Sequence, residues 1–302
     1  VVLHPAVPQG NRDGVDTGGV AGFATVCQPM TFTADWQRIL DQRHHLGDDF
    51  WTTADRRLNK GGIFSLMSSL LLLKELEYPK DDMIRIALDR IWATQRPDGR
   101  FKISPDGAIY PCQTINAFQV LCAWGEGEDP RLITTCDHLL STQEARGGWR
   151  CKKFSFGKGP ETELANPGPT LSALAAFAQM PGWTQRPELT PSVLFLLDHW
   201  DAKVPWGPCH YGMGTLFHQI EYPFQTYNLF NYGLTLSYYP VAHTDPRFQE
   251  AVTLLESKLN KGQVVVERTN PKLANFDFCR KGEVSQKATQ HWQTILHNLH
   301  RE

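Results

Sequence analysis

The chain has 302 residues, of which 41% are hydrophobic and 21% charged, a composition typical of a globular protein with a sizeable core. Thirty basic and 32 acidic residues give a formal net charge of −2, which argues against a nucleic-acid or membrane-surface partner. No apolar run reaches the roughly 20 residues that a membrane-spanning helix needs. Seven cysteines, an odd number in a long chain, favour reduced thiols, so we expect a cytoplasmic protein.

Helical periodicity starts near residue 33. Residues 1–32 are rich in Gly, Val and Pro without a sustained period, so we expect an extended arm there and a single domain over 33–302. After a first helix at 33–46, segments that are apolar on nearly every face alternate with segments expected on the outside. The expected inner helices are 62–76, 110–125, 166–180 and 222–239, and the expected outer helices are 81–95, 129–143, 192–202 and 245–260. A β-rich link at 262–282 precedes a last helix at 284–300.

This alternation repeats as one pattern along the middle of the chain. In the first two passes, a helix that ends in Gln is followed by a link with Gly and an aromatic residue, and then by a Thr that opens an apolar helix. Thr114 and Thr170 are followed at the same interval of 56 residues by Thr226. A period of about 50 residues, built from two helices and a link, is typical of a repeat architecture. We therefore expect an all-α fold, an α/α toroid of about five helical hairpins in two concentric layers.

The segments GRF…YPCQTINAFQVL, GGWRC…NPGPTLSALAAF and PWGPCHY…FQTYNLFNYGL resemble the repeat of the prenyltransferase and squalene-cyclase family. This family comprises the β subunits of protein prenyltransferases and the class II terpene cyclases, and the resemblance covers roughly residues 55–295. It implies an α/α toroid with a central cavity whose mouth is lined by the N-terminal ends of the inner helices. Because fold alone does not give function, the catalytic motifs of the family have to be compared residue by residue.

The acidic motif of the class II cyclases, DxDD before an inner helix, is absent. Asn166, Pro167 and Gly168 stand in its place, and only Glu161 and Glu163 lie just upstream as weaker candidate acids. The sequence therefore puts ordinary class II cyclisation in doubt.

The prenyltransferase zinc site, an Asp, a Cys and a His, is not reproduced either, because Gln225 stands where the His is expected. A different zinc site remains open, since thiolates and imidazole suit zinc. Its ligands would be Cys112, Cys151, Cys209 and His210. Otherwise we expect no cofactor.

A run of basic residues, GWRCKKFSFGKG, lies in the second link. Arg150, Lys152 and Lys153 belong to it, and Arg100 in the preceding link is a further candidate. Cationic side chains beside the starts of inner helices would suit a carboxylate or a diphosphate. A solvated basic loop is the alternative interpretation.

The function that we expect is acid–base chemistry, such as cyclisation, isomerisation or elimination, on a partly apolar small molecule that is isoprenoid-like or anionic. The candidate catalytic residues are His210, Tyr211, Glu163, Glu221, Cys209 and Tyr227. The candidate substrate-binding residues are Tyr110, Cys112, Trp149, Arg150, Cys151, Lys153, Asn166, Trp206, Gln225 and Asn228. Two alternatives remain open: a zinc-thiolate transferase or hydrolase, and a non-catalytic binding or scaffold protein. The scaffold would have a cavity filled by Phe and Trp side chains without convergent polar groups.

Overall fold

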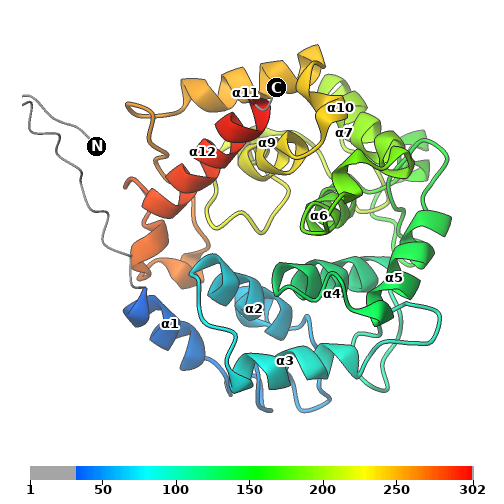
Figure 1. The fold of residues 1–302 in the computed structure, drawn as a ribbon, viewed down its shortest axis with the longest axis vertical. Coiled ribbons are helices and arrows are strands. Elements are labelled where there is room, and N and C mark those ends of the chain that lie inside the picture. Colours follow the sequence, from blue (N-terminus) through cyan, green and yellow to red (C-terminus); the bar gives the residue numbers. More distant parts are fainter. Residues whose placement is uncertain (1–31, 301–302) are drawn as a thin grey trace, which may run out of the picture. The chain divides into compact units, whose positions relative to one another are not determined.

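The computed structural model describes residues 32–300, and this part of the chain is all-α (Figure 1). The predicted arm at 1–32 lies, apart from Phe32, outside the described residues. Between residues 32 and 300 no extended strand forms, and the link at 262–282, predicted to be β-rich, takes part only in isolated bridges such as Val265 with Val284. Among the described helices, none has the length and apolar character needed to cross a membrane.

The α-helices match most of the predicted segments. They are α1 (Thr33–Leu40), α2 (Leu66–Glu75), α3 (Asp82–Trp92), α4 (Pro111–Ala123), α5 (Pro130–Ser141), α6 (Pro167–Phe177), α7 (Thr190–Ala202), α8 (Thr215–His218), α9 (Leu229–Ser237), α10 (Pro240–His243), α11 (Pro246–Ser257) and α12 (Gln286–Leu299). The Asp-Pro pairs before α5 and α11 form the helix starts that the sequence predicts, with the Asp129 and Asp245 carboxylates accepting backbone N–H groups.

The apolar helices pack on one another in chain order. Helix α2 contacts α4, α4 contacts α6, α6 contacts α9, and α9 contacts α12, while α5, α7 and α11 lie against α4, α6 and α9 (Figure 1). Side chains of α12 also reach back to α2, where His291 Nε2 lies 2.6 Å from Glu75 Oε1. The contacts of α2, α4, α6, α9 and α12 therefore form a closed sequence.

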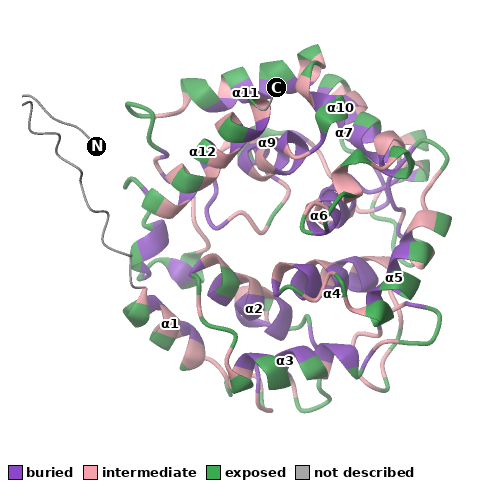
Figure 2. Cartoon of the chain, in the orientation of Figure 1, coloured by how far each residue is buried: buried purple, intermediate pink, exposed green. Residues whose placement is uncertain are grey.

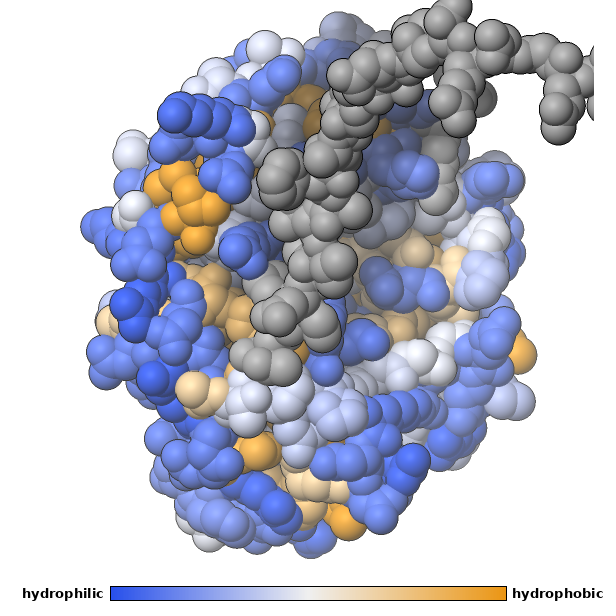
Figure 3. All heavy atoms as spheres, turned by 60° about the vertical axis from the view of Figure 1, so that its left-hand side comes forward, coloured by the Kyte–Doolittle hydropathy of each residue, from blue (hydrophilic) through white to orange (hydrophobic). Residues whose placement is uncertain are grey.

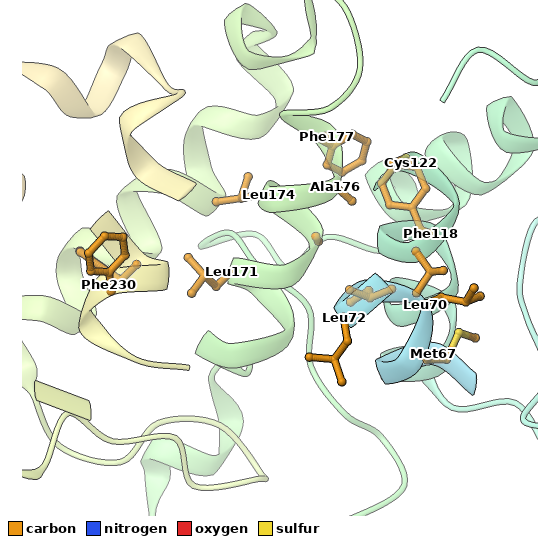
Figure 4. Close-up of a cluster of buried hydrophobic side chains, with 14 of the residues drawn as sticks. Met67, Leu70, Leu72, Phe118, Cys122, Leu171, Leu174, Ala176, Phe177 and Phe230 are labelled. Carbon is orange, nitrogen blue, oxygen red and sulfur yellow. The ribbon is translucent and has the colours of Figure 1, made fainter. Parts of the chain in front are cut away.

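Burial follows this arrangement. Helix α3 is buried on one side and exposed on the other (Figure 2), whereas eight residues of α6 are buried. Side chains of α2, α4, α6 and α9 interdigitate in the cluster of Figure 4, which labels Met67, Leu70, Leu72, Phe118, Cys122, Leu171, Leu174, Ala176, Phe177 and Phe230. Mostly polar and charged residues cover the face in Figure 3, and its apolar residues are scattered.

A hydroxyl group joins each of the first two links to the inner helix that follows it. Thr114 Oγ1 accepts the backbone N–H of Phe101 at 3.1 Å, and Thr170 Oγ1 accepts that of Trp149 at 3.3 Å. All four residues are buried, so these N–H groups have no access to water. The Thr and the aromatic residue therefore recur together because one supplies the acceptor and the other the backbone donor of the same hydrogen bond.

The Gln and Gly of the pattern bind the next outer helix. Gln95 Nε2 donates to Thr135 Oγ1 at 3.1 Å, and Gln143 donates likewise to the Ser192 hydroxyl. Gly147 has φ +93°, and a Cβ there would lie 2.1 Å from the Pro191 carbonyl oxygen, so only glycine fits. Each link is thus held between its own inner helix and the following hairpin.

The third pass departs from the equal spacing. Thr226 lies before α9, which begins only at Leu229, and its hydroxyl donates to Glu221 Oε2 at 2.9 Å. Asn228 is the N-cap instead and accepts the Asn231 N–H. The prediction that Thr226 opens the inner helix is wrong, because the segment around Glu221 pairs with Arg268 from the link before α12.

We predict that Thr170→Val lowers the free energy of unfolding by about 1–3 kcal/mol, because the buried Trp149 N–H loses its acceptor while side-chain volume is kept. Urea denaturation measures the change. Thr134→Val is the control: Thr134 is exposed on α5, so its substitution should change stability by no more than about 0.5 kcal/mol. Equal losses in both variants would show that the Trp149 contact contributes nothing specific.

Candidate functional site

Two cysteines from separate links, Cys151 and Cys209, meet Cys112 of the first turn of α4. Cys112, Cys151 and Cys209 line one pocket of about 80 Å³ together with Tyr211, and we call this the thiol pocket. The Cys151 thiol is close enough to Cys209 to affect its pKa. A shared zinc site would require Cys112, Cys151, Cys209 and His210 to converge; the three cysteines line this pocket, and His210 does not.

Asn166 holds Cys209 in place. It is buried at the N-cap of α6, but its side chain does not cap that helix; its Oδ1 accepts the Cys209 N–H at 3.0 Å. The approach requires a glycine opposite, because a Cβ on Gly207 would lie 2.4 Å from the same oxygen. Asn166, which stands where the class II cyclases have an acidic residue, therefore holds the backbone of Cys209 in place.

Cys209, Cys112 and Tyr211 are protonated at neutral pH. Burial, reinforced by the neighbouring Cys151 and Cys112 thiols, raises the pKa of Cys209 to about 11. Burial also raises the pKa of Cys112, and it raises the pKa of Tyr211 to about 12, with the adjacent thiols adding to the shift. Because the thiolate is the nucleophilic form, Cys112 and Cys209 are poor nucleophiles as they stand.

A second pocket adjoins the first and is rich in cations. It has a volume of about 270 Å³ and is lined by Arg100, Arg150, Lys152 and Lys153; we call it the basic pocket. The two pockets share Pro111, Trp149 and Arg150 in their walls. Lys152 and Lys153 are exposed, so both interpretations of the basic run, a receptor for anions and a solvated loop, stay open.

The carboxylates and the histidine predicted to be catalytic lie apart from the thiols. His210 is exposed, with Nε2 at 3.8 Å from Glu161 Oε1, and Glu163 is exposed and forms an ion pair of 2.8 Å with Arg150. Glu221 is buried and paired with Arg268 at 3.3 Å. None of the three is part of the thiol-pocket lining.

The remaining predicted residues have structural contacts. Tyr227 bonds through its hydroxyl to His199 Nδ1 at 2.8 Å, and burial lowers the pKa of His199 to about 4, so this histidine is neutral at neutral pH. Trp206 packs on the His199 ring, and Tyr110 contacts Phe154. Asn228 caps α9, as described above, and Gln225 faces the central pocket described below.

The zinc ligand set is not assembled. Within residues 32–300, no group of three or more His, Cys, Asp and Glu side chains is placed to hold a metal ion. His210, the predicted imidazole ligand, lies beside Glu161 and Gly157. The alternative of a zinc-thiolate site therefore finds no support in this geometry.

A larger pocket lies toward the C-terminal ends of α2, α4 and α6. It has a volume of about 580 Å³, and we call it the central pocket. Its walls come from the C-terminal halves of these three helices, from both halves of α9, from the N-terminal half of α12, and from the segment 223–225. Its lining residues are Leu71, Lys74, Glu75, Glu77, Tyr78, Gln119, Ala123, Ala175, Gln179, Pro223, Phe224, Gln225, Asn231, Leu234, Tyr238, Lys287 and His291.

One carboxylate organises the polar side of the central pocket. Glu75 Oε1 accepts the Tyr222 hydroxyl at 2.6 Å and lies 2.6 Å from His291 Nε2. Burial acts to raise the pKa of Glu75, but His291, the Tyr222 hydroxyl and Lys287 outweigh it, and the net pKa is lowered. Glu75 is therefore ionised at neutral pH and orients the imidazole.

Sequence reasoning missed this pair. Glu75 ends a helix that is otherwise mostly apolar, and His291 lies 216 residues further on, with no motif connecting them. The one available signal was Tyr222, which belongs to the dense polar and aromatic stretch before α9.

The sequence matches no protein-family model, and no curated protein gives a significant match to it.

We predict that Cys209 reacts slowly with iodoacetamide at pH 8 and that its rate rises until about pH 11. A pKa of about 11 in place of about 9 lowers the thiolate fraction at pH 8 roughly 100-fold. Mass spectrometry of the Cys209 peptide over a pH series measures the rate, with the urea-unfolded chain as the reference and Cys209→Ser as the blank. A folded-state rate that levels off near pH 8 would contradict the assignment.

Proposed function

We propose that residues 33–300 form an α/α toroid of the prenyltransferase and squalene-cyclase type, and that the protein is an enzyme whose reaction takes place in the central pocket. The closed sequence of contacts through α2, α4, α6, α9 and α12 supports the toroid, as does the flanking position of α5, α7 and α11. The pocket lies among the inner helices, where such a toroid has its cavity.

The observation that carries the proposal is the short contact between Glu75 and His291 in the pocket wall. The ionised Glu75 carboxylate accepts a hydrogen bond from His291 Nε2–H, so Nδ1 carries the lone pair of the neutral imidazole. Within residues 32–300 the imidazole has no second hydrogen-bond partner. His291 therefore acts as the general base. Glu75 orients the imidazole ring and stabilises the imidazolium that forms.

The rest of the lining indicates the kind of ligand. Leu71, Ala175 and Leu234 supply apolar surface, and Lys74 and Gln119 supply hydrogen-bond donors. A pocket of this mixture suits a partly apolar small molecule with one polar end. Proton abstraction next to a carbonyl group, leading to isomerisation or elimination, is the chemistry that one half-buried base supports most directly.

A scaffold that has lost its activity is less well supported. Such a protein would have a cavity filled by aromatic side chains without convergent polar groups. Phe224 does stack on Phe230 beside the central pocket, but Glu75, Tyr222 and His291 converge in the same region.

We predict that the isoprenoid ketone geranylacetone binds in the central pocket and that Ala175→Phe abolishes binding, because the added ring fills the cavity. Isothermal titration calorimetry measures the affinity. Ala93→Phe, an exposed position at the end of α3, is the matched control and should bind like the unmodified protein. If both variants bind equally well, the ligand lies elsewhere.

We predict that the protein speeds the exchange of solvent deuterium into the α-carbon of geranylacetone, and that His291→Gln and Glu75→Gln each slow this exchange about 10²-fold or more. Mass spectrometry follows the exchange, and titration confirms that the ligand still binds. Glu256→Gln, on the exposed side of α11, is the control. Unchanged exchange in both pocket variants, with stability reduced, would make the pair a structural connection between α2 and α12.

A further inference from the structure

The basic pocket has more positive charge than its surroundings neutralise. Its lining has four cationic side chains, and Glu144 is the one carboxylate among the lining residues. Arg100 is paired with Asp98 at 2.6 Å and Arg150 with Glu163 at 2.8 Å. Lys152 and Lys153, by contrast, form no ion pair within the described part of the chain.

Arg150 also has an unsatisfied donor. One of its terminal nitrogens bonds Glu163, but its Nε–H is buried and finds no acceptor. A buried guanidinium N–H without a partner is costly, and in native proteins such a group usually has a protein, water or ligand oxygen beside it. Arg150 lines the pocket, so a ligand oxygen there would supply the missing acceptor once a shift of this side chain brings the Nε–H to the pocket surface.

The place of the pocket separates it from the central pocket. It lies between the start of α4 and the end of α5, where His138 contributes to its wall, and its lining shares no residue with that of the central pocket. Its volume of about 270 Å³ admits a small group rather than a long apolar chain.

We propose that the basic pocket binds a phosphate group, and this role is independent of the function proposed for the central pocket. A phosphate has a charge close to −2 at neutral pH and three acceptor oxygens. It matches a lining with a surplus of cations, whereas a carboxylate would neutralise only one. Arg100 already donates to Asp98 through Nε and Nη2, so the cations left for phosphate oxygens are the ammonium groups of Lys152 and Lys153, with Arg150 beside them.

Titration of inorganic phosphate into the full chain, followed by calorimetry, tests the proposal. We expect one phosphate per chain, and about tenfold weaker binding or more in Arg150→Gln and in Lys153→Ala. Arg150→Lys should also bind more weakly, because it keeps the charge but loses the Nε–H donor. Lys153 is exposed, so its variant should fold normally even if an Arg150 variant does not.

Lys272→Ala is the matched control, because Lys272 is exposed, belongs to neither pocket lining, and forms no ion pair among the described residues. Unchanged affinity in this variant, with loss in the pocket variants, supports a built phosphate site. Equal loss in all variants would mean general attraction by surface charge and would overturn the proposal. So would the absence of binding, or acetate binding as tightly as phosphate, which would indicate a carboxylate site.

Discussion

The hydroxyl groups of Thr114 and Thr170 fix where each link meets its inner helix. Each accepts a backbone N–H that is buried and would otherwise be unpaired, so the aromatic residue of the link can occupy only one position above the helix start. Gly147 then has to lie directly against the backbone of the following outer helix. The contact between the threonine hydroxyl and the link N–H thus fixes the position of the link relative to its inner helix and to the next hairpin. The groups at both ends of the inner helices are positioned by this contact in turn.

Those two ends present different chemistry. Helix α4 has Cys112 in its first turn and Ala123 as its last residue, and its 13 residues span about 20 Å. One end is surrounded by protonated thiols and by cations, and the other by an ionised carboxylate with its imidazole. This difference is the reason why we propose proton transfer in the central pocket and recognition of charge in the basic pocket.

The sequence predicts those features that depend on local pattern. Helices α4 and α6 lie where the apolar segments place them, and the convergence of Cys112, Cys151 and Cys209 follows from the repetition of the links. Thr226 departs from the pattern because Glu221, five residues before it, pairs with Arg268. This distant contact determines the conformation of the segment that contains both Glu221 and Thr226. The partnership of Glu75 with His291 has no local signal at all, since only the closure of the whole domain brings α2 and α12 together.

The separation of Glu75 and His291 along the chain has a consequence for how the protein acquires its chemistry. The two residues are 216 positions apart, so their contact closes a much longer loop than the contacts between neighbouring hairpins do. Contacts between neighbouring hairpins cost far less chain entropy and can form early, whereas this one is formed when the first and last inner helices dock. An incompletely folded chain would therefore have its thiols gathered while still lacking its base, and the proposed activity would report on completion of the domain.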